Sequence, residues 1–210
     1  MNRTTLAEPA VHLVDDEAPV RDALTFLLRS HGLNVRPYPG GTELLAAFDA
    51  QRPRGCILLD VRMEPLSGLQ VHGALIERGN DLPVIFLSGH GDIPMAVDAL
   101  HKGAFDFVEK PFSDATLVQR VQQAMAVEAA RHAIDAQAAE RQAHLASLTR
   151  REGEVMRRVA AGKLNKVIAD ELCVSVRTVE VHRARVFAKL GVRSAAELAT
   201  LLATGRTLDA

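Results

Sequence analysis

The sequence predicts an α/β fold: a doubly wound, five-stranded parallel sheet, followed by a helical segment and a smaller all-α domain. Between residues 10 and about 125, short apolar runs alternate five times with amphipathic stretches. Such alternation is typical of a parallel sheet covered by helices on both faces. Right-handed crossovers make a doubly wound order the default. After residue 125 the strand pattern stops, and the remaining sequence favours helices.

Each expected strand and helix is bounded by residues that begin or end regular structure. Pro19 stands in the first turn of the first helix, and Gly32, Gly79 and Gly103 follow the ends of three helices. These are positions where proline and glycine are favoured. The expected strands, each with the helix that follows it, occupy residues 10–14 and 18–31, 34–38 and 42–48, 56–59 and 67–78, 83–88 and 93–102, and 105–108 and 113 onward.

The charge of the chain reverses between its two ends. Residues 1–144 hold 13 Lys and Arg against 19 Asp and Glu, a net charge of −6, and residues 145–210 hold 12 against 7, a net charge of +5. An acidic part and a basic part suggest two domains with different partners. A small basic domain most often binds nucleic acid.

A helical linker is expected between the two domains. Residues from about 121 to 146 are rich in Ala, Gln, Glu and Arg and contain no Gly or Pro, a composition that favours helix. We expect the first domain over residues 8–125, the linker over 126–146 and the second domain over 147–210. The second domain should contain three or four short helices, broken at Gly162, near Val174-Ser175 and at Gly191.

Polar side chains stand at the ends of four expected strands. Asp15 and Asp16 follow the first strand, Asp60 the third, Ser88 the fourth and Lys110 the fifth. Parallel strands bring their carboxyl ends to one edge of a sheet, where ligands bind in open α/β folds. Crowded carboxylates repel one another unless a cation lies between them, and oxygen ligands suit Mg²⁺. With Lys110 and a hydroxyl nearby to bind a phosphoryl group, Asp60 is the expected nucleophile, forming an acyl phosphate.

Around these positions the sequence resembles the receiver domain of bacterial two-component response regulators. The matching segments are Val14-Asp15-Asp16-Glu17, Leu59-Asp60, Arg62-Met63, Ser67-Gly68, Ser88-Gly89-His90-Gly91-Asp92, Pro94-Met95-Ala96 and the stretch from Gly103 to Phe112. The resemblance implies a flavodoxin-like sheet with strand order 2-1-3-4-5. The sequence departs from relatives at Glu64, because they usually have proline four residues past the phosphoacceptor and here Pro65 comes one residue later.

The resemblance also implies roles for individual residues. Asp60 would be the phosphoacceptor. Mg²⁺ or Mn²⁺ would be held by Asp16, by Asp15 through water, by Asp60 and by the backbone carbonyl of Arg62. Ser88 and Lys110 would contact the phosphoryl group, and Phe107 would be the switch residue. The phosphoryl donor would be a sensor histidine kinase. The peptide bond between Lys110 and Pro111 is expected to be cis, as in relatives.

The second domain contains two amphipathic helices joined by a tight turn near Val174-Ser175. Their shared apolar face comprises Ile168, Ala169, Leu172, Val179, Val186 and Leu190. Basic residues clustered on a helix-turn-helix favour DNA binding, with the second helix in the major groove and basic groups on phosphates. The expected DNA contacts are Lys166, Arg177, Thr178, Glu180, His182, Arg183, Arg185 and Lys189, of which Thr178, Glu180 and His182 come early enough in the second helix to reach base edges.

Residues 147–202 resemble the LuxR-type helix-turn-helix domain. The match is carried by Leu148-Thr149, Arg151-Glu152, Glu154-Val155, Gly162, Asn165-Lys166, Ile168-Ala169, Thr178-Val179, His182, Lys189-Leu190, Val192 and Ser194. A receiver, a helical linker and this domain, in this order, resemble the NarL/FixJ subfamily of response regulators, nearer to FixJ. The resemblance implies a transcription regulator, usually an activator working with RNA polymerase, that binds double-stranded DNA and forms a homodimer when phosphorylated.

Composition argues against several other classes of protein. No run approaches the roughly 18 apolar residues of a membrane helix, and the polar start from Met1 to Thr5 lacks the apolar stretch of a signal peptide. We therefore expect a cytoplasmic protein that does not bind membranes. Cys56 and Cys173 both look like small buried apolar residues in a reducing compartment, and neither a disulfide nor a Cys/His metal site is expected.

Other functions fit parts of the pattern. An unphosphorylated first domain could act only as a docking module with an acidic pocket, so that transcription is regulated constitutively. A phosphatase is disfavoured because nothing positions a water-activating base, and a dehalogenase-type hydrolase would have Asp-x-Asp where Asp60 is followed by Val61-Arg62. No Gly-rich nucleotide-binding motif follows any strand. Beyond slow self-dephosphorylation, no enzyme activity is expected.

Overall fold

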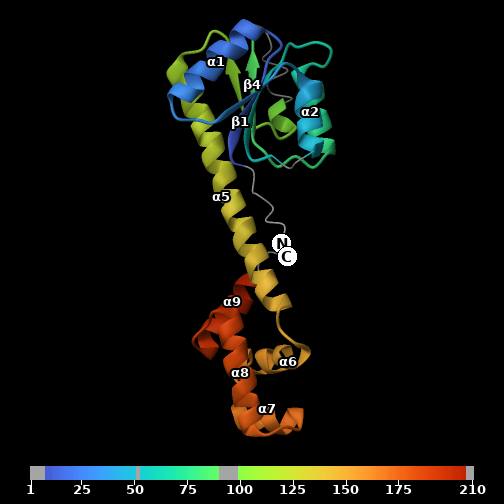
Figure 1. The fold of residues 1–210 in the computed structure, drawn as a ribbon, viewed down its shortest axis with the longest axis vertical. Coiled ribbons are helices and arrows are strands. Elements are labelled where there is room, and N and C mark those ends of the chain that lie inside the picture. The colour runs from blue at the N-terminus through green and yellow to red at the C-terminus, as the bar shows by residue number, and fades with distance from the viewer. Residues whose placement is uncertain (1–7, 51–52, 90–98, 207–210) are drawn as a thin grey trace. The chain divides into compact units, whose positions relative to one another are not determined.

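The computed structural model describes residues 8–50, 53–89 and 99–206 (Figure 1). They divide after His132 into two compact units. Helices in these ranges are too short or too polar to cross a membrane.

The first unit is built on a five-stranded parallel sheet with the strand order β2-β1-β3-β4-β5. The strands are β1 (Ala10–Val14), β2 (Val35–Tyr38), β3 (Gly55–Asp60), β4 (Val84–Ser88) and β5 (Asp106–Glu109). Every residue of β1, β3 and β4 is buried, as expected for central strands covered on both faces. The predicted fold class and strand order are confirmed.

Helices pack on both faces of this sheet (Figure 1). The helices of the unit are α1 (Ala18–Ser30), α2 (Gly41–Ala50), α3 (Gly68–Glu77) and the first part of α5 (Asp114–Ala146). Helices α1 and α5 share one apolar cluster with the sheet, which includes Leu28 and Leu117. Helices α2 and α3 share a second cluster on the other face, which includes Leu44 and Leu75.

Part of the predicted fourth helix and the loop before it cannot be compared with the structure. The loop residues His90, Gly91 and Asp92 and most of the helix expected over residues 93–102 lie outside the described residues. Residues 99–101 are helical, in agreement with the expected end of that helix.

Helix α5 is one helix of 33 residues that runs through the predicted linker without a break. Its contacts with the first unit continue past residue 125. Glu128 is 6% exposed and accepts hydrogen bonds from Arg54, with Nε to Oε1 at 3.0 Å and Nη2 to Oε2 at 3.3 Å. Arg131 donates through Nη1 to the backbone oxygen of Asp81 at 2.8 Å. The domain boundaries at 125 and 146 stay predictions.

The described residues of the second unit form four helices after α5. These are α6 (Arg150–Ala160), α7 (Asn165–Leu172), α8 (Val176–Leu190) and α9 (Ala195–Arg206). Their breaks fall where the sequence predicted them. Ser175 caps α8 by accepting from the backbone N–H of Thr178, and Gly191 ends α8 in the left-handed conformation with φ 65°. The six predicted apolar residues of α7 and α8 are all buried in one core.

The prediction that both cysteines are buried is half wrong. Cys56 lies inside β3, where burial raises the pKa of its thiol to about 12. Cys173 is exposed, because it ends α7 in the left-handed conformation with φ 52° and the chain turns there towards α8.

The ion pair between Arg54 and Glu128 gives a test of how α5 is held. Glu128→Ala would leave the Arg54 side chain, 19% exposed, without its partner, and we expect the receiver to lose about 3 kcal/mol of stability, the low end for a broken buried pair. Tyr38 is the single tyrosine of a chain without tryptophan, so its fluorescence during urea unfolding reports on the first unit.

Glu140→Ala, on an exposed part of the same helix, is the matched control and should change stability by less than about 0.5 kcal/mol. Equal effects of the two substitutions would mean that the pair does not hold α5.

Candidate functional site

Asp60 is the last residue of β3 and is 6% exposed. Its Oδ2 accepts a hydrogen bond from the backbone N–H of Arg62 at 2.8 Å, and its Oδ1 accepts one from Nζ of Lys110 at 2.6 Å. Helix α3 begins directly against this strand end at Gly68, where a Cβ atom would lie 2.2 Å from the backbone oxygen of Asp60. Glycine is therefore required here for close approach rather than for an unusual dihedral angle.

Asp15 lies beside Asp60 and is 1% exposed. Its Oδ1 accepts from the backbone N–H of Glu17 at 2.9 Å. Its Oδ2 is buried without a hydrogen bond and lies 3.6 Å from Nζ of Lys110. Burial raises the pKa of Asp15. Burial would by itself lower the pKa of Lys110, but its hydrogen bond to Asp60 and the charges of Asp60 and Asp15 outweigh that effect and raise it.

Ser88 ends β4 and Phe107 lies on β5. Ser88 is 1% exposed; its Oγ donates to the backbone oxygen of Gly89 at 3.0 Å, and its own backbone oxygen accepts from the N–H of Lys110 at 2.6 Å. Phe107 is half-buried and packs against the cluster under α2 and α3. The structure therefore brings Asp15, Asp60, Ser88 and Lys110 together at the carboxyl edge of the sheet.

Asp16 is exposed, unlike its neighbour, and its Oδ2 accepts a hydrogen bond from the backbone N–H of Glu64 at 3.3 Å. The loop that departs from relatives thus reaches the site through Glu64. The peptide bond after Lys110 is cis as expected, and the one between Glu64 and Pro65 is cis as well.

The sequence did not indicate two contacts that hold the acidic loop. Arg21 of α1 donates through Nη1 to the backbone oxygen of Asp15 at 2.7 Å, and Glu64 contributes only its backbone N–H. The residue type of Glu64 does not indicate that its backbone N–H donates a hydrogen bond. Arg21 could have been suspected only from its place one turn into α1.

The described residues contain no group of three or more His, Cys, Asp or Glu side chains arranged to hold a metal ion. At the receiver site the Lys110 ammonium makes the close contact with Asp60. The donor set is nevertheless all oxygen, which Mg²⁺ and Mn²⁺ prefer, and the buried Oδ2 of Asp15 has no hydrogen bond. A buried carboxylate oxygen of this kind is costly unless a donor or cation meets it, so these residues fit a divalent cation.

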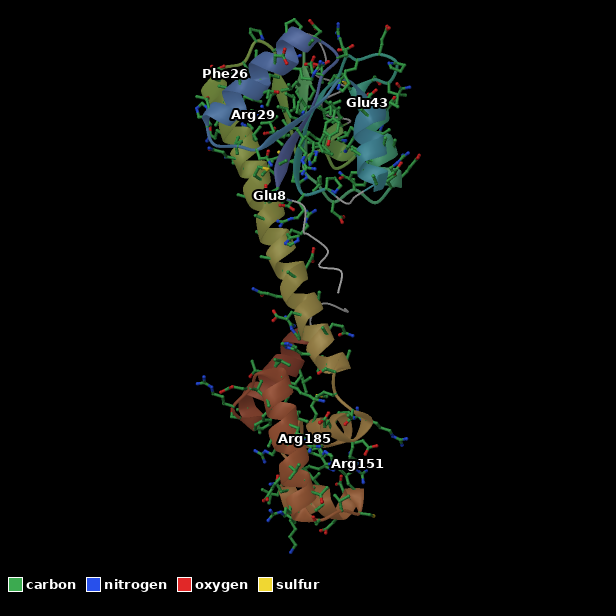
Figure 2. The ribbon with its side chains drawn as sticks, in the orientation of Figure 1. Glu8, Phe26, Arg29, Glu43, Arg151 and Arg185 are labelled. Carbon is green, nitrogen blue, oxygen red and sulfur yellow. The ribbon has the colours of Figure 1, made fainter. Side chains whose placement is uncertain are left out.

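In the second unit, one face of α8 is exposed. It includes Arg177, Glu180, Val181, Ala184 and Arg185, whose spacing places them on the same side of a helix. Arg185 can be seen on α8 in Figure 2. Val181 was not among the predicted contacts, although it is 44% exposed. Its exposure could not be predicted from residue type, because the buried valines nearby differ from it only in their position along α8.

Other predicted DNA contacts have partners within the domain. Lys189 donates through Nζ to Glu152 Oε2 at 2.7 Å and to the backbone oxygen of Ser147 at 2.9 Å. Arg183 donates to Asn165 Oδ1 at 3.0 Å. The Thr178 hydroxyl lies 2.8 Å from that of Ser175.

His182 and Lys166 differ in their exposure. His182 is half-buried, and its Nδ1 is buried without a hydrogen bond. Lys166 on α7 is exposed. Among the predicted contacts, Lys166, Arg177, Glu180 and Arg185 are therefore the exposed ones.

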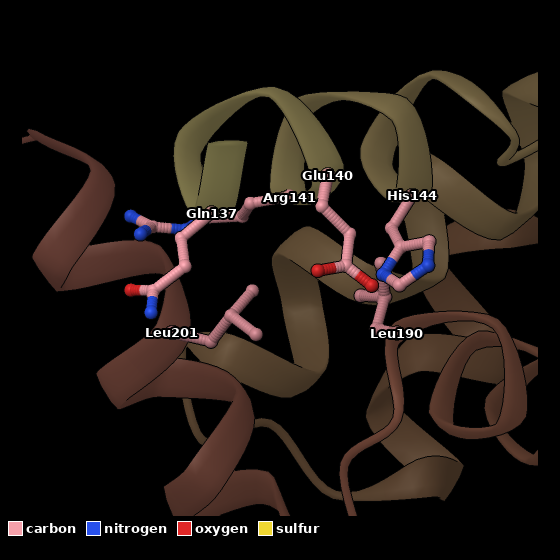
Figure 3. A pocket seen from close by; sticks show the side chains of 6 residues that line it. All are labelled: Gln137, Glu140, Arg141, His144, Leu190 and Leu201. Carbon is pink, nitrogen blue, oxygen red and sulfur yellow. The ribbon is translucent and has the colours of Figure 1, made fainter. Parts of the chain in front are cut away.

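A cavity of about 310 Å³ lies within the second unit among α5, α8 and α9 (Figure 3). Glu140, Arg141 and His144 of α5 line it together with Leu190 and Leu201. Its charged side chains are exposed or half-exposed, so none of them is a buried polar group that calls for a ligand.

Comparisons with known proteins agree with this architecture. The response regulator receiver domain family matches residues 11–122, and the luxR family of bacterial regulatory proteins matches residues 146–202. The C4-dicarboxylate transport transcriptional regulatory protein DctR of Rhodobacter capsulatus is 50% identical over 194 residues, covering 91% of this chain and 98% of DctR. The transcriptional regulatory protein FixJ of Rhizobium meliloti is 38% identical over 200 residues, covering 95% and 98%.

A solved structure is also similar. The low-resolution structure of the response regulator StyR shares 36% identity, covers 94% of this chain and 100% of its own, and gives a TM-score of 0.86. The chain therefore belongs to the two-component response regulators of the NarL/FixJ subfamily, as a transcription regulator with a receiver domain followed by a LuxR-type helix-turn-helix domain.

Proposed function

We propose that Asp60 accepts a phosphoryl group from a sensor histidine kinase and that this acyl phosphate controls DNA binding by the second unit. The observation that carries the proposal is the convergence of Asp60 with Lys110, Asp15 and Ser88, with Lys110 Nζ 2.6 Å from Asp60 Oδ1. A carboxylate held in this way is an available nucleophile.

The residues of the site have separate tasks in the transfer. A carboxylate oxygen of Asp60 attacks phosphorus, the bond between phosphorus and the histidine nitrogen of the kinase breaks, and its electron pair stays on that nitrogen. The Arg62 N–H bonded to Oδ2 fixes the orientation of the carboxylate. Lys110 then exchanges its carboxylate partner for a phosphoryl oxygen, and the Ser88 hydroxyl donates to another.

A divalent cation would fit the negative charge of this site. Asp15, Asp16, Asp60 and the backbone carbonyl of Arg62 would hold Mg²⁺ or Mn²⁺. When bound, the ion neutralises charge on the transferred phosphoryl group. Support comes from the buried oxygen of Asp15, which lacks a hydrogen bond, and from the raised pKa that burial gives this carboxyl.

DNA binding is proposed for the exposed face of α8. Arg177 and Arg185 would meet phosphates, together with Lys166 of α7, while Glu180 and Val181 would face base edges. Arg183, Thr178, His182 and Lys189 stay predicted DNA contacts, although Arg183, Thr178 and Lys189 have partners within the domain.

The output would follow from a change in the receiver surface. Phosphorylation adds up to about two negative charges, Ser88 moves towards them, and Phe107 turns into the space that is vacated. The altered surface would pair with a second receiver, and the homodimer would activate transcription with RNA polymerase.

Asp60→Asn should abolish phosphorylation because an amide is no nucleophile at phosphorus. After treatment with acetyl phosphate and Mg²⁺, intact mass should rise by about 80 Da for the unchanged protein and not for the variant. Asp135→Asn, an exposed carboxylate of α5, should still be labelled. Labelling of Asp60→Asn at the same level would overturn the assignment.

Metal binding should respond in opposite directions to two substitutions. Asp15→Asn removes a charged ligand and should weaken Mg²⁺ binding by more than about tenfold, a loss seen even for outer-shell metal partners. Lys110→Gln removes a competing cation from Asp60 and should tighten it. Calorimetric titration measures both, and a Lys110→Gln variant with weakened Mg²⁺ binding would contradict this account.

Lys166→Ala and Arg185→Ala should weaken binding to duplex DNA of random sequence. Each lost phosphate contact should reduce the slope of log affinity against log salt by about 0.9. Arg36→Ala, exposed on β2 of the receiver, is the control and should leave the slope unchanged. If the slopes of both the Lys166 and the Arg185 variant equal that of the unchanged protein, these two residues do not contact phosphate.

A further inference from the structure

The acidic loop between β1 and α1 holds its two aspartates in different ways. Asp15 is 1% exposed, whereas Asp16 is exposed. The Asp16 carboxylate accepts its hydrogen bond from the backbone N–H of Glu64 at 3.3 Å, longer than is usual for such bonds. An exposed carboxylate with a long hydrogen bond is held weakly by its own contacts, so the backbone of the loop has to set where it lies.

Both peptide groups next to Asp16 are held by side chains. The group between Asp15 and Asp16 accepts, through the Asp15 oxygen, a hydrogen bond from Arg21 Nη1 at 2.7 Å. The group between Asp16 and Glu17 donates, through the Glu17 N–H, to Asp15 Oδ1 at 2.9 Å. Because a peptide group is planar, a bond to one of its polar atoms orients the whole group. Together the two contacts set the direction of the backbone at Asp16.

Arg21 reaches the loop from α1. Its backbone N–H donates to the oxygen of Glu17 at 3.0 Å, so the residue lies one turn into the helix. Side chains of a helix tilt towards its amino end, and the acidic loop lies at that end of α1. The group that the guanidinium binds is a backbone oxygen and not a carboxylate. The contact therefore fixes the geometry of the loop rather than neutralising an acid.

We propose that Arg21 is a positioning residue for the divalent cation of the receiver, acting through the peptide group between Asp15 and Asp16 on the Asp16 carboxylate. This inference rests on the proposed function for the ligands of the cation. By its charge alone, a guanidinium near a cation site would weaken Mg²⁺ binding. Geometry and charge therefore predict opposite results when Arg21 is removed, because lost positioning weakens Mg²⁺ binding and lost repulsion tightens it.

Arg21→Met removes the charge and the donors and keeps an unbranched apolar side chain. Calorimetric titration of the full-length protein with Mg²⁺ alone, without a phosphoryl donor, measures the affinity directly. We expect binding about tenfold weaker than in the unchanged protein, the lower end of losses seen when a partner of a metal ligand is removed. Unchanged or tighter binding would overturn the proposal, as would an unchanged protein that binds no Mg²⁺.

Arg29→Met is the matched control. Arg29 is also a side chain of α1 (Figure 2), and each of the two guanidiniums donates to a backbone oxygen six residues away. The acceptor of Arg29 is the oxygen of Val35 on β2, at 3.1 Å, and not the acidic loop. Urea unfolding followed by Tyr38 fluorescence should show similar losses of stability in both variants, while Arg29→Met keeps its Mg²⁺ affinity. Equal weakening of Mg²⁺ binding by both would overturn the proposal.

Phosphorylation supplies a second readout. With excess acetyl phosphate, the Mg²⁺ concentration that gives half the maximal labelling rate should rise about tenfold in Arg21→Met. The rate at saturating Mg²⁺ should equal that of the unchanged protein, because Asp60 and Lys110 keep their contact. A lower maximal rate at an unchanged half-maximal concentration would contradict positioning. Absence of labelling in the unchanged protein would instead contradict the proposed function, and the calorimetric comparison would still decide the role of Arg21.

Discussion

The parallel register of β3, β4 and β5 is the constraint on which the receiver site depends. Asp60 pairs with Leu87 on β4, and Ser88 pairs with Glu109 on β5. Lys110 follows directly, so its side chain can cross the end of β4 to reach Asp60. A shift of one residue would turn the side chains of a strand to the opposite face of the sheet, and Lys110 would no longer meet the carboxylate. The buried, continuous apolar strands fix this register.

The same packing explains why Asp15 and Asp60 can lie close together. Two buried carboxylates repel each other, and the burial of Asp15 already disfavours its charge. The Lys110 ammonium, 2.6 Å from Asp60 and 3.6 Å from Asp15, offsets that repulsion. A site arranged in this way has its negative charge balanced by the Lys110 side chain, so a phosphoryl group or a cation that binds there changes the partners of that ammonium.

Much of the fold could be predicted from the sequence because periodicity and end signals are local. Pro19, Gly79 and Gly191 marked helix ends that the structure confirms, and the strand ends at Asp60 and Ser88 followed from apolar runs. Contacts set by tertiary packing could not be predicted. The hydrogen bonds of Glu128 with Arg54 and of Lys189 with Glu152 join residues 74 and 37 positions apart, and nothing in residue type distinguishes these charges from solvated ones.

The ion pair between Glu152 and Lys189 has a consequence for acid tolerance. The hydrogen bond from Lys189, with that from Thr149, lowers the pKa of Glu152 from 4.5 to about 2. A carboxyl with a depressed pKa contributes stability above its unfolded value and loses that contribution as pH falls towards its folded value. As pH falls, the contribution of Glu152 to the tie between α6 and the end of α8 is therefore lost between about pH 4.5 and pH 2, and it is fully present near neutral pH.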